Sequence, residues 1–183
     1  MLRLRSVVVL LVVLAFPASA VAGSSATGDR ALSSARTTVT RDTSLEALVL
    51  REINAVRTSH GLKRLSASSA LSRSAAGHSR AMATHGFFSH ESRNGALFSQ
   101  RIKQFYVPRS GSWSVGENLA MFGGMTPTAG AIVATWMGSP PHRANLLREI
   151  FREAGLAIMF NPAAGGVFGG DSTWVVTLDL GRR

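Results

Sequence analysis

Two histidines and one glutamate, in three separate segments, are the residues of this chain best suited to chemistry. His90 ends the segment His-Gly-Phe-Phe-Ser-His, Glu117 lies in Gly-Glu-Asn-Leu, and His142 follows a Pro-Pro pair. Neutral imidazoles and a carboxylate bind divalent cations such as zinc or a magnesium-like ion, and they also exchange protons. If the fold brings the three together, we expect a cleft that can bind a divalent cation or transfer a proton.

Each of these residues also has a purely structural interpretation. A histidine after a helix end is more often a satisfied hydrogen-bonding group than a ligand. A carboxylate in a buried strand must be paired, and backbone N–H groups can serve as well as a cation. We expect His142 near a helix N-terminus, where the dipole favours the neutral ring and a local hydrogen bond would satisfy it. His60, His78 and His85 are expected to be structural or exposed, with a reservation for His85 because it is close to His90.

The sequence lacks the common signatures of hydrolases and of nucleotide-binding enzymes. It contains no H-E-x-x-H helix, no G-x-S-x-G elbow and no phosphate-binding P-loop. The absence of cysteine excludes thiolate catalysis, thiolate metal sites and disulfides. Ser89 and Ser139 lie near histidines, but serine is too frequent in this chain for either to be a convincing nucleophile. We therefore assign no catalytic residue and expect a binding module in preference to an enzyme.

The N-terminal 22 residues are typical of a secretory signal peptide. Two arginines precede an apolar run over residues 7–16, and small residues then permit cleavage after Ala20 or Ala22. The run is shorter than the roughly 20 apolar residues that span a membrane, which argues against an uncleaved anchor. We predict residues 1–22 to be a signal peptide and the protein to be secreted and extracellular.

The remaining chain divides into a linker and one domain. Residues 23–42 are rich in Ser, Thr, Ala and Arg and are predicted to form a flexible linker, and residues 43–183 to form a single domain. The formal net charge of +10 suits an anionic cell-wall or membrane-surface component as partner. Export argues against nucleic acid. Because the arginines are spread along the chain, a basic surface with no specific partner explains the charge equally well.

Apolar periodicity predicts helices first and strands last, which indicates an α+β fold. Ser44 and Thr126 are the expected N-caps of the first and fourth helix, and Gly86 is expected to end the second in the left-handed conformation. Ser139 is expected to cap a further short helix with prolines in its first turn. The predicted helices cover residues 44–61, 68–85, 95–105 and 126–139, and a hairpin of strands is predicted over residues 154–160 and 173–180.

The three segments, in this order, resemble the motifs of the CAP superfamily, which comprises cysteine-rich secretory proteins, antigen 5 and pathogenesis-related 1 proteins. The form is that of the SCP-like domain that bacteria secrete, and the resemblance extends over residues 45–181. It implies an α–β–α sandwich with a central antiparallel sheet and a large cleft on one face.

Many family members hold two histidines and two acidic residues in this cleft, and the resemblance implies these roles for His90, Glu117 and His142. The fourth position, just after Trp136, carries no acid here. Arg143 and Asn145 are expected to brace the surrounding loops.

Three functions follow as alternatives. The first is a secreted CAP domain that acts at the cell envelope as a binding module, with a cation-binding site of two histidines and one glutamate. The second is a metal-dependent hydrolase of peptide or cell-wall polymer, in which the cation activates water. The third is a carrier of lipid or sterol, because family members bind such ligands between helices. The missing second acid and the lack of a nucleophile favour the first.

Overall fold

The computed structural model describes residues 38–108 and 113–183, and it contains one sheet of five strands. The predicted signal peptide and the linker up to residue 37 lie outside the described residues. The strands are β1 (Thr40–Arg41), β2 (Ser66–Ala67), β3 (Ser114–Gly123), β4 (Glu153–Asn161) and β5 (Thr173–Arg182). β5 pairs antiparallel with both β4 and β3, so the predicted hairpin of β4 and β5 is confirmed.

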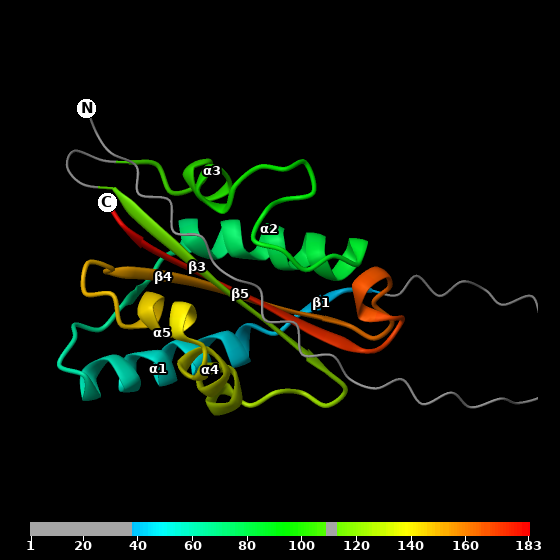
Figure 1. Cartoon of the computed structure of the whole chain (residues 1–183), viewed down its shortest axis with the longest axis horizontal. Coiled ribbons are helices and arrows are strands. Elements are labelled where there is room, and N and C mark those ends of the chain that lie inside the picture. Colours follow the sequence, from blue (N-terminus) through cyan, green and yellow to red (C-terminus); the bar gives the residue numbers. More distant parts are fainter. Residues whose placement is uncertain (1–37, 109–112) are drawn as a thin grey trace, which may run out of the picture. The chain divides into compact units, whose positions relative to one another are not determined.

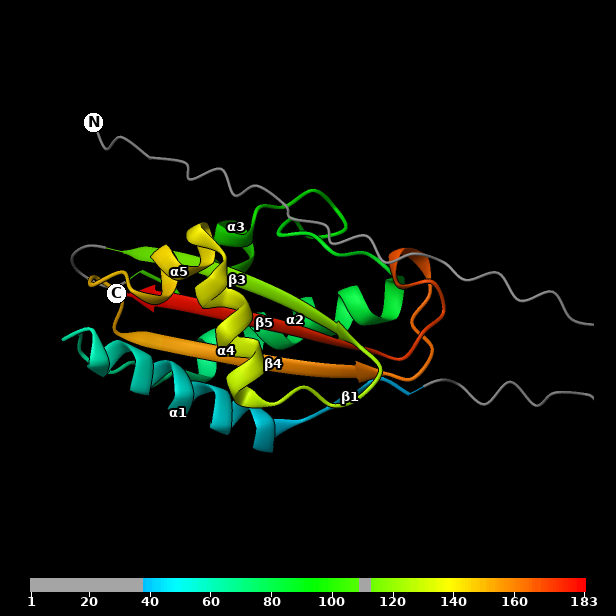
Figure 2. The same ribbon diagram turned by 60° about the horizontal axis from the view of Figure 1, so that its bottom comes forward.

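Helices cover both faces of the sheet, as Figures 1 and 2 show. α2 and α3 lie on one face, and α1, α4 and α5 lie on the other, with a short 3-10 turn, η1, between β4 and β5. This arrangement confirms the expected α–β–α sandwich. Among the described residues, no helix is both long and apolar enough to cross a membrane. The helices are α1 (Thr43–Ser59), α2 (Ser69–His85), α3 (Phe98–Lys103), α4 (Ala129–Gly138), α5 (Pro140–Leu146) and η1 (Gly166–Phe168).

The central strands carry apolar residues on both faces because helices cover the sheet on both sides. Ile158 and Val176 belong to the apolar cluster formed with α1 and α4. Met159 and Val175 instead pack with Met82 of α2. This double burial explains why the alternation of the last strand is interrupted in the sequence at two consecutive valines.

Two predicted helix caps are wrong by two residues. Asp42, rather than Ser44, caps α1, because its carboxylate accepts the Leu45 N–H at 2.9 Å and the Ser44 hydroxyl donates to it as well. Thr128, rather than Thr126, caps α4. In both cases the sequence offers several capping residues in a row, and only the tertiary position of the helix selects one.

Two further features of the chain differ from the sequence prediction. The helix predicted over residues 95–105 begins only at Phe98, because the preceding segment forms a turn in which the Ser92 N–H bonds to the Ala96 carbonyl. The two-residue strands β1 and β2 were not predicted, since each is held by pairing with β4. β1 lies within residues 23–42, so the sheet includes part of the segment predicted to be linker.

Side chains close the outer edge of β4 between its two short partner strands. Glu46 of α1 accepts a hydrogen bond from the Ile158 N–H at 3.0 Å and holds the Arg41 guanidinium at 2.7 Å. Arg41 in turn donates to the Leu156 carbonyl at 3.2 Å. Backbone groups of this edge are therefore satisfied by side chains where no neighbouring strand is present.

Arg57 of α1 is fully buried and connects α1 to the segments around α5. Its guanidinium donates to the carbonyls of Lys63 at 2.9 Å and Leu146 at 2.6 Å, and also to that of Phe151. These carbonyls belong to the segment after α1, to the last residue of α5 and to the segment that joins α5 to β4. Arg57 thereby fixes the C-terminal end of α5, the short helix that carries His142 in its first turn.

Gly155 of β4 lies directly against α2, since a β-carbon there would come within 2.1 Å of the Ser72 backbone nitrogen. We expect Gly155→Ala to lower the free energy of unfolding, measured by urea denaturation, by about 1–3 kcal/mol because α2 must move. Gly77→Ala, on α2, is the matched control, because a β-carbon there has no other atom within 4 Å. It should raise stability by about 0.5–1 kcal/mol. Similar effects of the two changes would contradict this packing.

Candidate functional site

The three predicted site residues converge around β3. Glu117 lies in the middle of this strand with its side chain fully buried, and its Oε1 lies 2.8 Å from Nδ1 of His90. His142 lies in the first turn of α5, and its backbone carbonyl accepts a hydrogen bond from Asn118 of β3 at 3.0 Å. The rings of His90 and His142 are close enough for a charge on His90 to lower the pKa of His142.

The loop that carries His90 is fixed at several points. Gly86 ends α2 in the left-handed conformation (φ 68°), as predicted. Nε2 of the buried His78 lies 2.7 Å from the carbonyl of Ser89, the residue before His90. Burial lowers the pKa of His78 to about 3, so its ring stays neutral and donates to this carbonyl. Phe87 packs on the edge of the His78 ring. The structural role expected for His78 is confirmed.

Arg101 of α3 supplies the positive charge that the buried Glu117 requires. Its Nη2 donates to Oε2 of Glu117, and its Nη1 donates to the His90 carbonyl at 3.2 Å and to Ser92 Oγ at 3.0 Å. The sequence analysis did not single out Arg101. The available signal was its position beside Ile102, on the side of a short helix that faces the interior. A buried carboxylate had to find a cation, and this arginine lies between the two motifs in the sequence.

Both site histidines are held in the neutral form. Burial lowers the pKa of His90, and the Arg101 guanidinium lowers it further. Burial likewise lowers the pKa of His142. Because a carboxylate oxygen accepts, Nδ1 of His90 carries the proton and its Nε2 remains free to accept a ligand.

The side of β3 toward α5 is held by two asparagines. Nδ2 of Asn145 donates to the Glu117 carbonyl at 3.1 Å and to Oδ1 of Asn118 at 2.9 Å. Asn118 in turn donates to the His142 carbonyl. Asn145 therefore braces the site as predicted. Arg143 is exposed and makes no such bond among the described residues.

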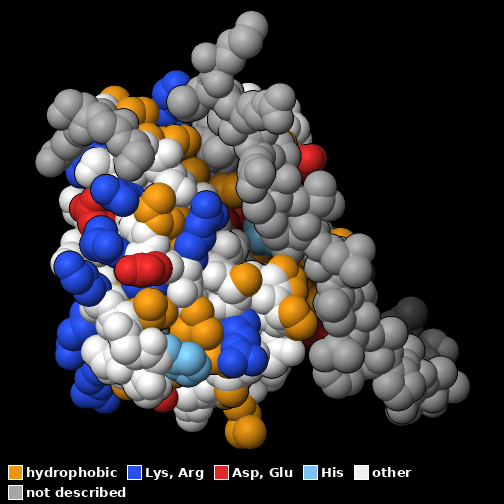
Figure 3. Space-filling view, turned by 60° about the vertical axis from the view of Figure 1, so that its left-hand side comes forward, with side chains coloured by type: hydrophobic (Ala, Val, Ile, Leu, Met, Phe, Trp, Pro, Cys, Tyr) orange, Lys and Arg blue, Asp and Glu red, His pale blue; other side chains and the backbone are white. Residues whose placement is uncertain are grey.

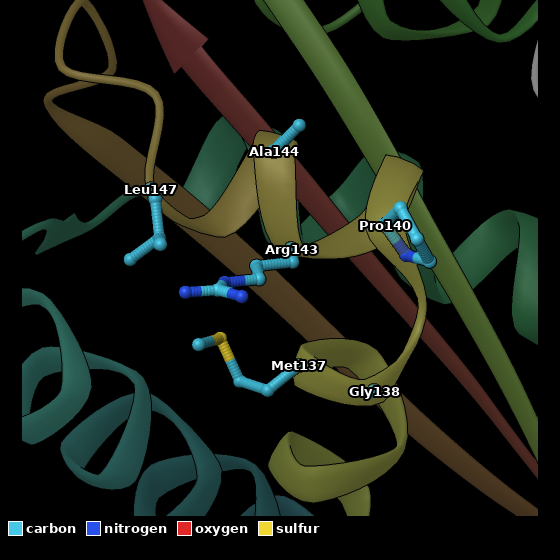
Figure 4. A pocket seen from close by; sticks show the side chains of 6 residues that line it. All are labelled: Met137, Gly138, Pro140, Arg143, Ala144 and Leu147. Atoms are coloured by element: carbon cyan, nitrogen blue, oxygen red, sulfur yellow. The ribbon is translucent and has the colours of Figure 1, made fainter.

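Arg143 instead lines a pocket of about 330 Å³ between α4 and α5. Its side chain extends between Leu147 and Met137 in Figure 4, so a guanidinium lies beside largely apolar walls. The remaining lining residues are Gly138, Pro140 and Ala144. The volume is at the lower end of those typical for small-molecule sites.

Asp179 of β5 is a second acid at the site that the sequence analysis missed. It is paired with Glu117 in the sheet register and is fully buried, and its polar neighbours are the Ser74 hydroxyl and the Glu117 carboxyl group. Burial raises its pKa well above the ordinary value, and the charge of Glu117 raises it further. The signal was a lone acid in the apolar segment Thr-Leu-Asp-Leu.

The two acids titrate as a pair that shares one guanidinium. Burial raises the pKa of Glu117 to about 7, although Arg101 acts in the opposite direction. Because Arg101 contacts Glu117 directly, Glu117 is the group that carries the charge and Asp179 is the group that keeps the proton.

Comparison with known sequences identifies the family. Residues 50–178 match the sequence model of the cysteine-rich secretory protein family, CAP. The chain belongs to this family. Its CAP domain contains no cysteine, so no disulfide holds the sandwich together. The Bacillus subtilis protein YkwD is 33% identical over 111 residues, which cover 61% of this chain and 41% of YkwD. The chain thus spans less than half the length of that relative.

Solved structures share the fold of this CAP domain. An extracellular protein with an SCP domain from Bacillus anthracis matches with a TM-score of 0.57 and 26% identity, over 74% of this chain and 39% of that one. An outer surface protein from Borrelia burgdorferi matches with a TM-score of 0.61 over 80% of this chain and 99% of that one. At 16% identity, the second likeness supports the fold alone.

Only some of the side chains at this site of the CAP domain are available to coordinate a cation. Among the described residues, no group of three or more His, Asp or Glu side chains is arranged to hold a metal ion. Both oxygens of Glu117 already accept hydrogen bonds, from His90 and Arg101. The imidazoles fit better, since within residues 38–108 and 113–183 neither Nε2 of His90 nor the buried Nδ1 of His142 has a hydrogen-bond partner.

Asp179 should make the stability of the domain fall as the pH rises. Between its ordinary pKa in the unfolded chain and its raised pKa in the folded one, the folded state binds the extra proton. Stability is therefore full below the unfolded pKa and decreases above it. Asp179→Asn removes this titratable group. We expect the free energy of unfolding of the variant, measured by urea denaturation, to change less with pH than that of the wild type between about pH 4 and pH 8.

Thr177→Val on the same strand is the control for this measurement. It removes the 2.7 Å hydrogen bond from Ser79 without changing a titratable group. We expect it to lower stability by about 1–3 kcal/mol to the same extent at every pH. Parallel pH profiles for the wild type and Asp179→Asn would rule out a proton held at Asp179.

Proposed function

We propose that this CAP domain acts outside the cytoplasmic membrane as a binding module. The signal-like residues 1–22 support this location. So does the extracellular Bacillus anthracis protein that shares its fold at 26% identity. The charge of +10 is compatible with work at an anionic cell envelope.

The observation that best supports this proposal is that both carboxylate oxygens of Glu117 already accept hydrogen bonds, from His90 and from Arg101. A hydrolase would need a base that reaches water or substrate, and a pKa of about 7 would suit that task. However, the Glu117 side chain is fully buried between Arg101 and His90, and Asp179 is equally enclosed. Binding is therefore better supported than metal-dependent hydrolysis of peptide or wall polymer.

The ligand that we propose for this site is a divalent cation held by His90 and His142. Glu117 would serve as the partner that orients the His90 ring, a role that carboxylates commonly play behind a metal-bound histidine. Imidazole nitrogens suit zinc better than a magnesium-like ion, which prefers oxygen. The buried, unpartnered Nδ1 of His142 supports the same assignment. When bound, the cation would supply a Lewis-acidic position with open coordination sites.

We expect zinc to bind the wild type in calorimetric titration and His90→Ala and His142→Ala to abolish the heat. Glu117→Gln should weaken binding by about tenfold or more, because the His90 ring loses its orienting acceptor. His60→Ala and His85→Ala, at exposed histidines, are the controls for adventitious zinc and should leave the heat unchanged. Equal heats in the wild type and in both site variants would remove the cation from the proposal.

A further inference from the structure

Backbone pairing brings arginines from three separate segments to one end of the sheet. The Ser66 N–H donates to the Arg152 carbonyl at 2.9 Å, and the Arg152 N–H donates to the Gly181 carbonyl at 3.0 Å. Arg64 precedes the first of these pairs by two residues, and Arg182 follows the last one directly. Residues that are dispersed in the sequence are therefore neighbours in the fold.

Two of these segments, around Arg152 and at Arg182, line an open groove of about 440 Å³ that is mainly basic. Figure 3 views this end of the molecule and shows Lys and Arg side chains gathered on it, with few acidic ones between them. The groove is separate from the histidine site and from the pocket between α4 and α5. Its lining residues are Arg148, Glu149, Ile150, Arg152 and Arg182.

Hydrogen bonds and a ring contact hold the arginine side chains of the groove, but among the described residues no carboxylate pairs with them. Nη1 of Arg152 donates to the carbonyls of Phe151, at 2.9 Å, and Glu149. The Arg148 guanidinium lies 5.4 Å from the centre of the Phe151 ring. Among the described residues, neither these two arginines nor Arg182 forms an ion pair with a carboxylate.

A further positive charge contacts the backbone of the segment that lines the groove. Among the described residues, the buried Arg57 donates hydrogen bonds to backbone carbonyls alone. Burial lowers the pKa of its guanidinium, and the charge of Arg152 lowers it further. In the part of the chain that the structure describes, no carboxylate forms an ion pair with either of these two guanidinium groups. An anion in the groove would relieve the repulsion between them.

We propose that this groove binds successive phosphate groups of a linear anionic polymer of the cell envelope. Guanidinium groups bind phosphate oxygens in a bidentate manner, and arginines that line a groove match charges that repeat along a chain. Attachment to a lipid bilayer fits this groove less well than binding of a phosphate polymer does. It uses large apolar side chains that insert beside the basic ones, and none of the exposed large hydrophobic residues lines this groove.

Titration of the full domain with inorganic polyphosphate tests the proposal. We expect salt-dependent binding to the wild type that weakens by about tenfold or more in the double variant Arg148→Gln/Arg182→Gln, with a shallower salt dependence. The matched control is Arg51→Gln/Arg73→Gln, which removes the same charge from exposed arginines of α1 and α2 and should change affinity less than about twofold. Glu149→Gln should strengthen binding.

Three outcomes would overturn the proposal. They are no binding of polyphosphate at low salt, equal losses in the two double variants, and binding to vesicles of phosphatidylglycerol but not to polyphosphate. Thermal unfolding of each variant establishes that it is folded. His90→Ala is expected to keep full polyphosphate binding, so this result is independent of the cation site.

Discussion

The ion pair between Arg101 and Glu117 determines how the site of this CAP domain is arranged. It joins α3 to the middle of β3, and the same guanidinium holds the loop that carries His90 through its backbone carbonyl. A buried ion pair contributes little net stability, but removing one partner costs about 3–5 kcal/mol because a charge stays buried alone. The pair therefore acts mainly by excluding other arrangements of the loop and the strand.

A second buried arginine plays the corresponding part on the other side of the sheet. Arg57 binds carbonyls at the end of α5 and in the segment that follows it, and Asn145 and Asn118 connect the same helix to β3. His142 is thus held by polar contacts from two elements, although α5 has only seven residues. Short helices and loops in this domain depend on long polar side chains, whereas α1 and α2 depend on apolar packing.

The sequence correctly predicted those parts of the structure that depend on the local order of residues. The apolar periodicity of α1 and α2, the glycine that ends α2 and the hairpin of β4 and β5 all follow from residue order. The three motif residues could be brought together only through the family resemblance. Arg101 and Asp179 could not be found in this way, because their roles depend on which strand and helix lie beside Glu117. The identity of the N-caps failed for a similar reason, since Asp42 and Thr128 compete with neighbouring capping residues.

The closed edge of β4 has a consequence for how the protein behaves at high concentration. Unpaired strand edges recruit strands of other molecules, and this is a common route to aggregation. Arg41 and Glu46 occupy the Leu156 carbonyl and the Ile158 N–H, which are the groups that an incoming strand would need. Two charged side chains at this place also carry a desolvation cost for any chain that tries to displace them. Arg41 and the first turn of α1 thereby protect the sheet against self-association along this edge.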